Sequence, residues 1–389
     1  MRVNKKIQEL ELIQNNENYM VLYNEKYFSV SRLFYEILEE LKNGKHEKNK
    51  FIATHGISEV NYEELSKIVS EKVNDMVKKT KPAKNYIFFA IKIFSEEKVI
   101  FLSKYLSVFF KKAIFRLLFP LVIILGFASY FIINTKYQNH SIFEMSLLDT
   151  FVVYFIILVI MIFHEFGHSA ASSSFGIKPK EIGFGFYILF PVLYSNVTRI
   201  WKLNKIEKVI VNLGGIYFQG IINILFLAFL IFNKDDNHVT YLVLLIVKAN
   251  LFVMVYSLFP FVRNDGYWIV SDYSNILNLN KKSYSYIFDL VKNKEKINYY
   301  LLSYSIGQYL FILYLGYKYL PSIPKSITEF HLYLKEHGLI YLIINDFGLF
   351  FKFIFSLLIG FVVISTLLRF IIPLFKKNKD IVKPVIANS

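Results

Sequence analysis

Five consecutive residues, His164-Glu165-Phe166-Gly167-His168, place two histidines and an acid at the end of a long apolar run. On a helix the two histidines lie one turn apart on the same face, where both can bind one zinc ion. Glu165 is then placed to take a proton from a water molecule at that metal. The spacing predicts a zinc-dependent hydrolytic site, with His164 and His168 as ligands and Glu165 as the catalytic base.

A catalytic zinc site normally has three protein ligands and one open position. The chain has no cysteine, so the third ligand must be His, Asp or Glu. The other histidines lie in the N-terminal region or in loops expected across the membrane: His46, His55, His140, His238, His331 and His337. Asp265 is expected at the same depth as His168, and we predict it as the third ligand. A simple ion pair with Arg263 is the alternative interpretation of this acid.

Composition sets the surroundings of this motif. Apolar residues make up 54% of the chain, aromatic residues 18%, and the mean hydropathy is +0.40, which is typical of a multi-span membrane protein. The net charge of +15 comes from lysines in the N-terminal region and between apolar runs. This pattern favours contact with an anionic lipid bilayer and argues against a nucleic-acid partner.

About six apolar stretches have the ~20 residues needed to cross a bilayer. They are residues 113–134, 147–172, 209–232, 241–262, 299–320 and 349–375. Basic residues precede the first stretch and recur in alternate loops, and the first twenty residues lack the apolar core of a secretory signal. We therefore expect a multi-pass protein of the bacterial plasma membrane with both termini in the cytoplasm. Residues 321–348 stay open between an outer loop and a re-entrant element.

The predicted fold class is an all-α polytopic membrane protein with a small cytosolic α+β domain and a membrane-surface β-hairpin. In the N-terminal domain we predict a hairpin, a helix after Ser31 and a second helix that begins at Asn61. The expected divisions are a winged-helix-like domain at 1–80, a linker and interfacial segment at 81–112, a transmembrane domain at 113–375 and a basic cytosolic tail at 376–389.

Two further features suggest how a substrate is held. Gly183 and Gly185 belong to a predicted hairpin that turns near Pro191, and this hairpin can bind an extended chain by strand addition. A plain amphipathic connector is the alternative. Asn250 lies inside the fourth apolar stretch, where it can orient a substrate carbonyl or form hydrogen bonds within the helix bundle.

Over about residues 113–275 the chain resembles the site-2 proteases, the intramembrane zinc metalloproteases. The resemblance rests on the His-Glu-x-x-His motif, on Asp265-Gly266, and on residues of the intervening helix: Gly214, Gly215, Gln219, Gly220 and Asn223. It implies that His164, His168 and Asp265 bind zinc and that Glu165 activates water. The family's glycine-proline-x-x-asparagine pattern is absent, so Gln219 and Asn223 both remain candidates for its asparagine and for substrate binding.

Residues 190–194, 215–217 and 260–267 look like the branch of this family found in bacterial peptide-maturation and bacteriocin-type gene clusters. That resemblance implies a metalloprotease that cleaves a peptide precursor near the cytoplasmic face during maturation of a ribosomally made peptide. Residues 1–80 also resemble leader-peptide-binding winged-helix domains, and a peptide exporter or a modifying enzyme is an expected partner.

Other functions remain open at this point. The substrate can instead be a membrane-anchored regulator or a signal-peptide remnant, cleaved by regulated intramembrane proteolysis. Outside proteolysis, the alternatives are a metal-containing component of peptide export and a transporter of metal or peptide.

Overall fold

The fold is known from a computed structural model that describes residues 7–14, 19–23, 26–43, 48–56, 58–79, 87–136, 147–187, 190–233, 238–293 and 297–345, with scattered positions from 349 to 368. These residues are mostly helical and fall into two units. The first contains the described residues up to Phe259 together with Asn264–Ile269. The second contains Pro260–Arg263 and the described residues from Val270 onward. Each unit is described by itself.

The first unit begins with a small α+β domain. Its elements are β1 (Glu11–Gln14), β2 (Tyr19–Tyr23), β3 (Lys26–Val30), α2 (Arg32–Asn43), α3 (Lys48–His55) and α4 (Glu59–Lys79). The strands form an antiparallel sheet in the order β1-β2-β3, and its core includes Ile37, Leu38 and Val73. The predicted hairpin is therefore present, with an additional strand. Its classification as a winged-helix domain stays a prediction.

Helix starts in this domain follow their capping side chains. Helix α2 begins directly after Ser31 as predicted, and Ser31 caps it, since the Phe34 N–H donates to its Oγ at 3.3 Å. The predicted start of the next long helix at Asn61 is wrong. Helix α4 begins two residues earlier because the Ser58 Oγ accepts the Asn61 N–H at 3.2 Å and so provides the cap.

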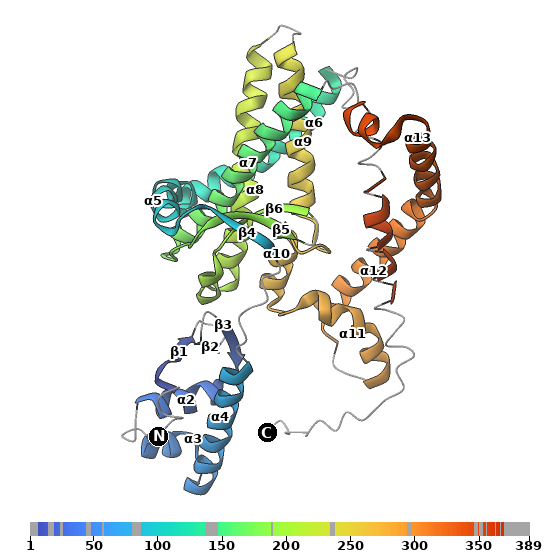
Figure 1. The fold of residues 1–389 in the computed structure, drawn as a ribbon. Helices are drawn as coiled ribbons and strands as arrows, with labels where there is room; N and C mark the ends of the chain where they lie inside the picture. Colours follow the sequence, from blue (N-terminus) through green and yellow to red (C-terminus); the bar gives the residue numbers. More distant parts are fainter. Residues whose placement is uncertain are drawn as a thin grey trace. The chain divides into compact units, whose positions relative to one another are not determined.

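Four long helices follow in the same unit: α6 (Lys112–Lys136), α7 (Leu147–Ser174), α8 (Lys205–Phe232) and α9 (His238–Ser257). Helix α8 packs against the other three (Figure 1). It begins at a capping box in which Asn204 Oδ1 accepts the Glu207 N–H at 3.0 Å and Glu207 accepts the Asn204 N–H at 3.1 Å. Fully buried apolar residues such as Ile216 and Val247 join α8 to α9.

These four helices are long and apolar enough to cross a membrane, which indicates a membrane protein. They correspond to the first four predicted spans. Helix α12 (Tyr299–Tyr319) covers the fifth predicted span but is not among the four, and much of the sixth span lies outside the described residues. The count of six spans and the orientation of the termini therefore stay predictions.

A second antiparallel sheet carries strands from two distant parts of the chain. It contains β4 (Ile87–Phe94), β5 (Ile182–Tyr187) and β6 (Phe190–Ser195), in the order β4-β5-β6. The predicted hairpin is thus β5 and β6, but Pro191 lies within β6 and is not at the turn. The strand β4 was not predicted, since residues 81–112 were interpreted as a linker and an interfacial segment. Helix α5 (Glu96–Leu106) and the short helix η1 (Ser107–Phe110) follow it.

In its described residues the second unit is mainly helical. Among its described elements are α11 (Leu279–Asn293), α12, and α13 (Ser322–Asn345), and α11 packs on α12. Helix α13 covers most of the segment left open between a loop and a re-entrant element. It is helical with a kink at Gly338, where φ is 79°. Whether it enters the bilayer stays a prediction.

Candidate metal centre

Helix α7 carries the His-Glu-x-x-His motif in its C-terminal half, with its residues turned into the protein. His164, Glu165 and His168 are only 3%, 6% and 7% exposed. The four-residue spacing puts both imidazoles on one helical face, and their Nε2 atoms are 3.1 Å apart. The helical placement predicted from the motif is therefore confirmed in the structure.

Glycines bring α8 against this face of α7. A Cβ added to Gly167 would lie 2.2 Å from the Gly214 carbonyl oxygen, so only glycine permits this approach of the two backbones. A Cβ on Gly215 would lie 2.4 Å from His164 Nε2. The pair Gly214-Gly215 therefore leaves room both for α7 and for the imidazole ring.

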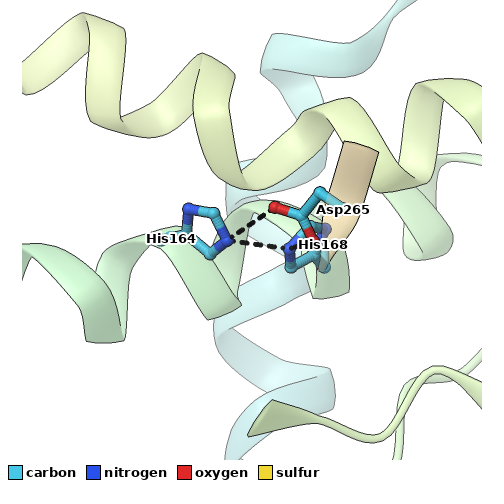
Figure 2. Close-up of side chains that lie close together, drawn as sticks. All are labelled: His164, His168 and Asp265. Atoms are coloured by element: carbon cyan, nitrogen blue, oxygen red, sulfur yellow. Dashed lines mark hydrogen bonds and ion pairs between the residues drawn. The ribbon is translucent and has the colours of Figure 1, made fainter. Parts of the chain in front are cut away.

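Asp265 reaches the histidines from the other side of the site. Helix α9 ends at Ser257, and α10 (Asp265–Ser274) begins with Asp265 in its first turn. Asp265 Oδ2 lies 3.1 Å from His164 Nε2, and Oδ1 lies 3.4 Å from His168 Nε2. Figure 2 shows the three side chains converging on one point. The structure thus brings together the three residues predicted as ligands.

The spacing of these atoms suits zinc. Ligands about 2.0–2.1 Å from a tetrahedral zinc ion are roughly 3.3–3.4 Å from one another. The observed separations of 3.1, 3.1 and 3.4 Å are close to that value. In addition, the buried Asp265 Oδ2 makes no hydrogen bond, which leaves its lone pairs free for a cation.

The hydrogen bonds behind the histidines determine which ring nitrogen faces the site. His168 Nδ1 is 2.8 Å from the Val211 carbonyl oxygen, and His164 Nδ1 is 2.8 Å from Gln219 Oε1. Both partners accept hydrogen bonds, so each neutral ring carries its proton on Nδ1 and directs the lone pair of Nε2 toward the site. Two such lone pairs and a carboxylate facing one another fit a bound cation.

Asp265 is held in its ionised form. Burial by itself raises the pKa of this carboxyl group, but when the two imidazoles are protonated the attraction of His168 and His164 outweighs burial and lowers the pKa below its ordinary value. The start of α10 adds the positive end of a helix dipole. A charged carboxylate is the form that binds a metal.

Glu165 lies beside the ligands and is contacted by the end of β6. The Ser195 backbone N–H donates to its carboxylate, and the Ser195 hydroxyl is 2.7 Å from that of Ser169, one residue after the motif. Neither Ser195 nor the Val211 carbonyl was predicted to belong to the site. No local pattern marks either group, since each contacts α7 only after distant segments pack together.

The other predicted site residues fall in two places. Gln219, Asn223 and Asn250 are buried together between α8 and α9, and Gln219 contacts His164 directly. Gly183 and Gly185 lie on β5, the central strand of its sheet, where β4 and β6 already pair with both edges. The edge of the hairpin that is open to strand addition therefore belongs to β6. The substrate-binding role of these five residues stays a prediction.

Comparison with known proteins gives one partial likeness. Over 126 residues the chain is 29% identical to the Bacillus subtilis (strain 168) protein named "Putative peptide zinc metalloprotease protein YydH". The match covers 31% of this chain and 45% of that protein. No protein-family model matches the chain, and no solved structure matches it.

The metal in the name of the Bacillus protein is zinc, and in this chain the cluster of His164, His168 and Asp265 provides a possible site for such an ion. The resemblance to site-2 proteases is more specific than this partial match supports.

Proposed function

We propose that the protein is an intramembrane zinc metalloprotease of the site-2 type, which hydrolyses a peptide bond near the cytoplasmic face of the membrane. The observation that carries the proposal is the convergence of two imidazoles and one carboxylate beside a buried glutamate, in the C-terminal half of a helix long enough to span a bilayer. Burying an acid in a membrane-spanning segment costs free energy, and residues of this kind generally mark a functional site.

His164, His168 and Asp265 would hold the metal. When bound, zinc supplies Lewis-acid chemistry that lowers the pKa of water and polarises a carbonyl group. Glu165 accepts the proton of the attacking water and then gives it to the nitrogen of the leaving amine. The Ser195 N–H keeps the Glu165 carboxylate oriented for both transfers.

Among the described strands none pairs with the outer edge of β6, and before Ser195, whose carbonyl accepts the Val197 N–H, this edge suits an extended substrate. Asn196 exchanges backbone hydrogen bonds with β5, since its N–H donates to Glu181 and its carbonyl accepts from Lys180. Along a strand the N–H and C=O groups of successive residues point alternately to the two neighbouring strands. The backbone groups of Ser195, Leu193 and Pro191 therefore face away from β5. Proline is tolerated at position 191 because an N–H at this position would point away from β5 and form no hydrogen bond with it. A peptide paired with this edge runs toward Glu165, which the Ser195 N–H already contacts.

Leu193→Pro tests this edge, because it removes the outward N–H without removing a hydrogen bond to β5. We expect a higher KM for an extended peptide substrate. Leu193→Ala is the matched control, since it removes the side chain and keeps the N–H. Equal effects of the two variants would contradict substrate pairing with β6.

The substrate class that best fits is the precursor of a ribosomally made peptide, captured by residues 1–80 and passed to the membrane domain. A peptide exporter or a modifying enzyme would act on the same peptide. Deletion of residues 1–80 is expected to abolish cleavage of a leader-bearing precursor. Unchanged cleavage would refute this role and favour a membrane-anchored regulator or a signal-peptide remnant as substrate.

Glu165→Gln tests the proteolytic function itself. The amide cannot accept the proton, so we expect cleavage to fall by about 10²–10⁴-fold. Zinc content should stay at the wild-type level because Glu165 is not a ligand. A variant that still cleaves would contradict the proposal. If neither it nor the wild type cleaves any peptide while both retain zinc, a non-proteolytic export component becomes the better account.

A further inference from the structure

A chain of three buried amides runs from the metal centre into the interface of α8 and α9. Gln219 Oε1 is 2.8 Å from His164 Nδ1, and Gln219 Nε2 donates to Asn250 Oδ1 at 2.9 Å. Asn250 Nδ2 donates to Asn223 Oδ1 at 2.7 Å and to the Gln219 carbonyl at 3.2 Å. Gln219, Asn250 and Asn223 are 0%, 1% and 0% exposed.

We propose that Gln219 and Asn250 are positioning residues that fix the ring orientation and tautomer of His164 for zinc binding. This inference rests on the proposed function, and it gives both residues a role different from direct contact with substrate. We call the hydrogen-bonded group of Gln219, Asn250 and Asn223 the amide relay.

The relay has a direction because each amide has one donating and one accepting end. Two acceptors, the Asn223 Oδ1 and the Gln219 carbonyl, hold the NH₂ group of Asn250. The Asn250 oxygen is thereby turned toward Gln219, where it takes the NH₂ group of that residue. Only the Gln219 oxygen is left for His164, so the proton of the ring must be on Nδ1. Burial excludes water as a substitute partner.

The two zinc-binding histidines differ in this respect. His168 Nδ1 contacts a backbone carbonyl, that of Val211, which no substitution removes. His164 Nδ1 contacts a side chain, and that side chain is oriented by another on a different helix. The affinity for zinc should therefore depend on α9 through His164 and not through His168. Partners of this kind typically change metal affinity by about 10–100-fold when they are removed.

Simple bundle stability is the competing explanation, since hydrogen bonds between helices also hold spans together. The two explanations differ over Gln219→Glu. A carboxyl group still accepts the proton of His164 Nδ1 with one oxygen, and in its protonated form its O–H donates to Asn250 Oδ1 as the amide of Gln219 does. Gln219→Leu has no acceptor at all.

The test is zinc affinity of the full-length purified protein, measured by competition with a chromophoric chelator, with the absorption spectrum of the cobalt-loaded protein as a second readout. We expect Gln219→Leu to weaken zinc binding by about 10–100-fold, Asn250→Leu to weaken it by a smaller factor, and Gln219→Glu to stay within about threefold of wild type. Leu244→Ala, at a buried apolar position on α9, is the control for lost packing and should keep its zinc affinity.

Three outcomes would overturn the inference. Wild-type affinity in Gln219→Leu would show that His164 needs no acceptor. Equal loss in Gln219→Glu and Gln219→Leu, or in Leu244→Ala, would assign the effect to packing, and Asn250→Leu decides the matter if Gln219→Leu does not fold. A wild-type protein that binds zinc no more tightly than His164→Ala would instead refute the metal centre, and the relay with it.

Discussion

Two buried polar clusters of this protein differ in how their hydrogen-bond donors and acceptors are matched. In the second unit, Ser283 donates to Gln308 Oε1 at 2.5 Å, and the Tyr304 hydroxyl donates to the Pro260 carbonyl at 2.8 Å. Each of these acceptors faces a hydroxyl group of the same cluster, and each hydroxyl group also contacts Asn280. At the metal centre both histidines give their N–H away from the site, and the lone pairs that remain face a carboxylate. The first cluster, which we call the matched cluster, therefore needs no ligand to satisfy its polar groups. At the metal centre, lone pairs face a carboxylate, and a bound cation would satisfy them.

The largest effect on zinc affinity is expected from the loss of a metal ligand, because only the metal centre should bind zinc. His168→Ala removes one of three donor atoms, so we expect zinc affinity to fall by more than the ~100-fold that changes behind a ligand cause. His238→Ala is the matched control, because this histidine is largely exposed and pairs with Asp149 at 2.9 Å. Zinc bound per protein, measured after dialysis, provides the comparison. Equal zinc content in the two variants would contradict the assignment.

A smaller effect is expected where the site is crowded but its ligands are kept. Gly215→Ala places a methyl group 2.4 Å from His164 Nε2, so the imidazole or α8 must shift. Zinc affinity should fall by about 10–100-fold, like the loss of a positioning contact. The matched control is Gly126→Ala, whose Cβ would meet its nearest atom at an ordinary 3.7 Å. Normal zinc binding by Gly215→Ala would show that the site tolerates more movement than the packing suggests.

The smallest effect on the metal is expected from the matched cluster. Ser283→Ala leaves Gln308 Oε1 without this donor, which should lower the free energy of unfolding by about 1–3 kcal/mol. Zinc affinity should not change. Thermal unfolding and zinc titration of the same sample check both statements. A loss of zinc comparable with that of His168→Ala would mean that the two clusters are not independent.

The parts of the site that were predictable are those with a local pattern. His164, Glu165 and His168 lie within one turn of a helix, so their spacing alone fixes their common face. Asp265 has no such pattern. It was reached by eliminating other ligands and by placing two helix ends at the same depth, and the structure puts its carboxylate against both histidines.

The parts that escaped prediction depend on contacts between distant segments. The strand β4 pairs with β5 across about ninety residues of chain, and such pairing leaves no trace in the local pattern of either segment. Gln219 and Asn250 were recognised as unusual polar residues in apolar helices. Their link to His164 could not be foreseen, because it requires the register of α8 against both α7 and α9.

The central claim is that two histidines and one aspartate bind zinc, and X-ray absorption at the zinc edge of the purified protein tests it most directly. The account predicts about one zinc per chain, with two imidazole nitrogens and a carboxylate oxygen among its ligands at ~2.0–2.2 Å. Asp265→Ala should lose the carboxylate contribution and most of the metal. Zinc-free wild-type protein, or an identical spectrum and full zinc content in Asp265→Ala, would contradict the account.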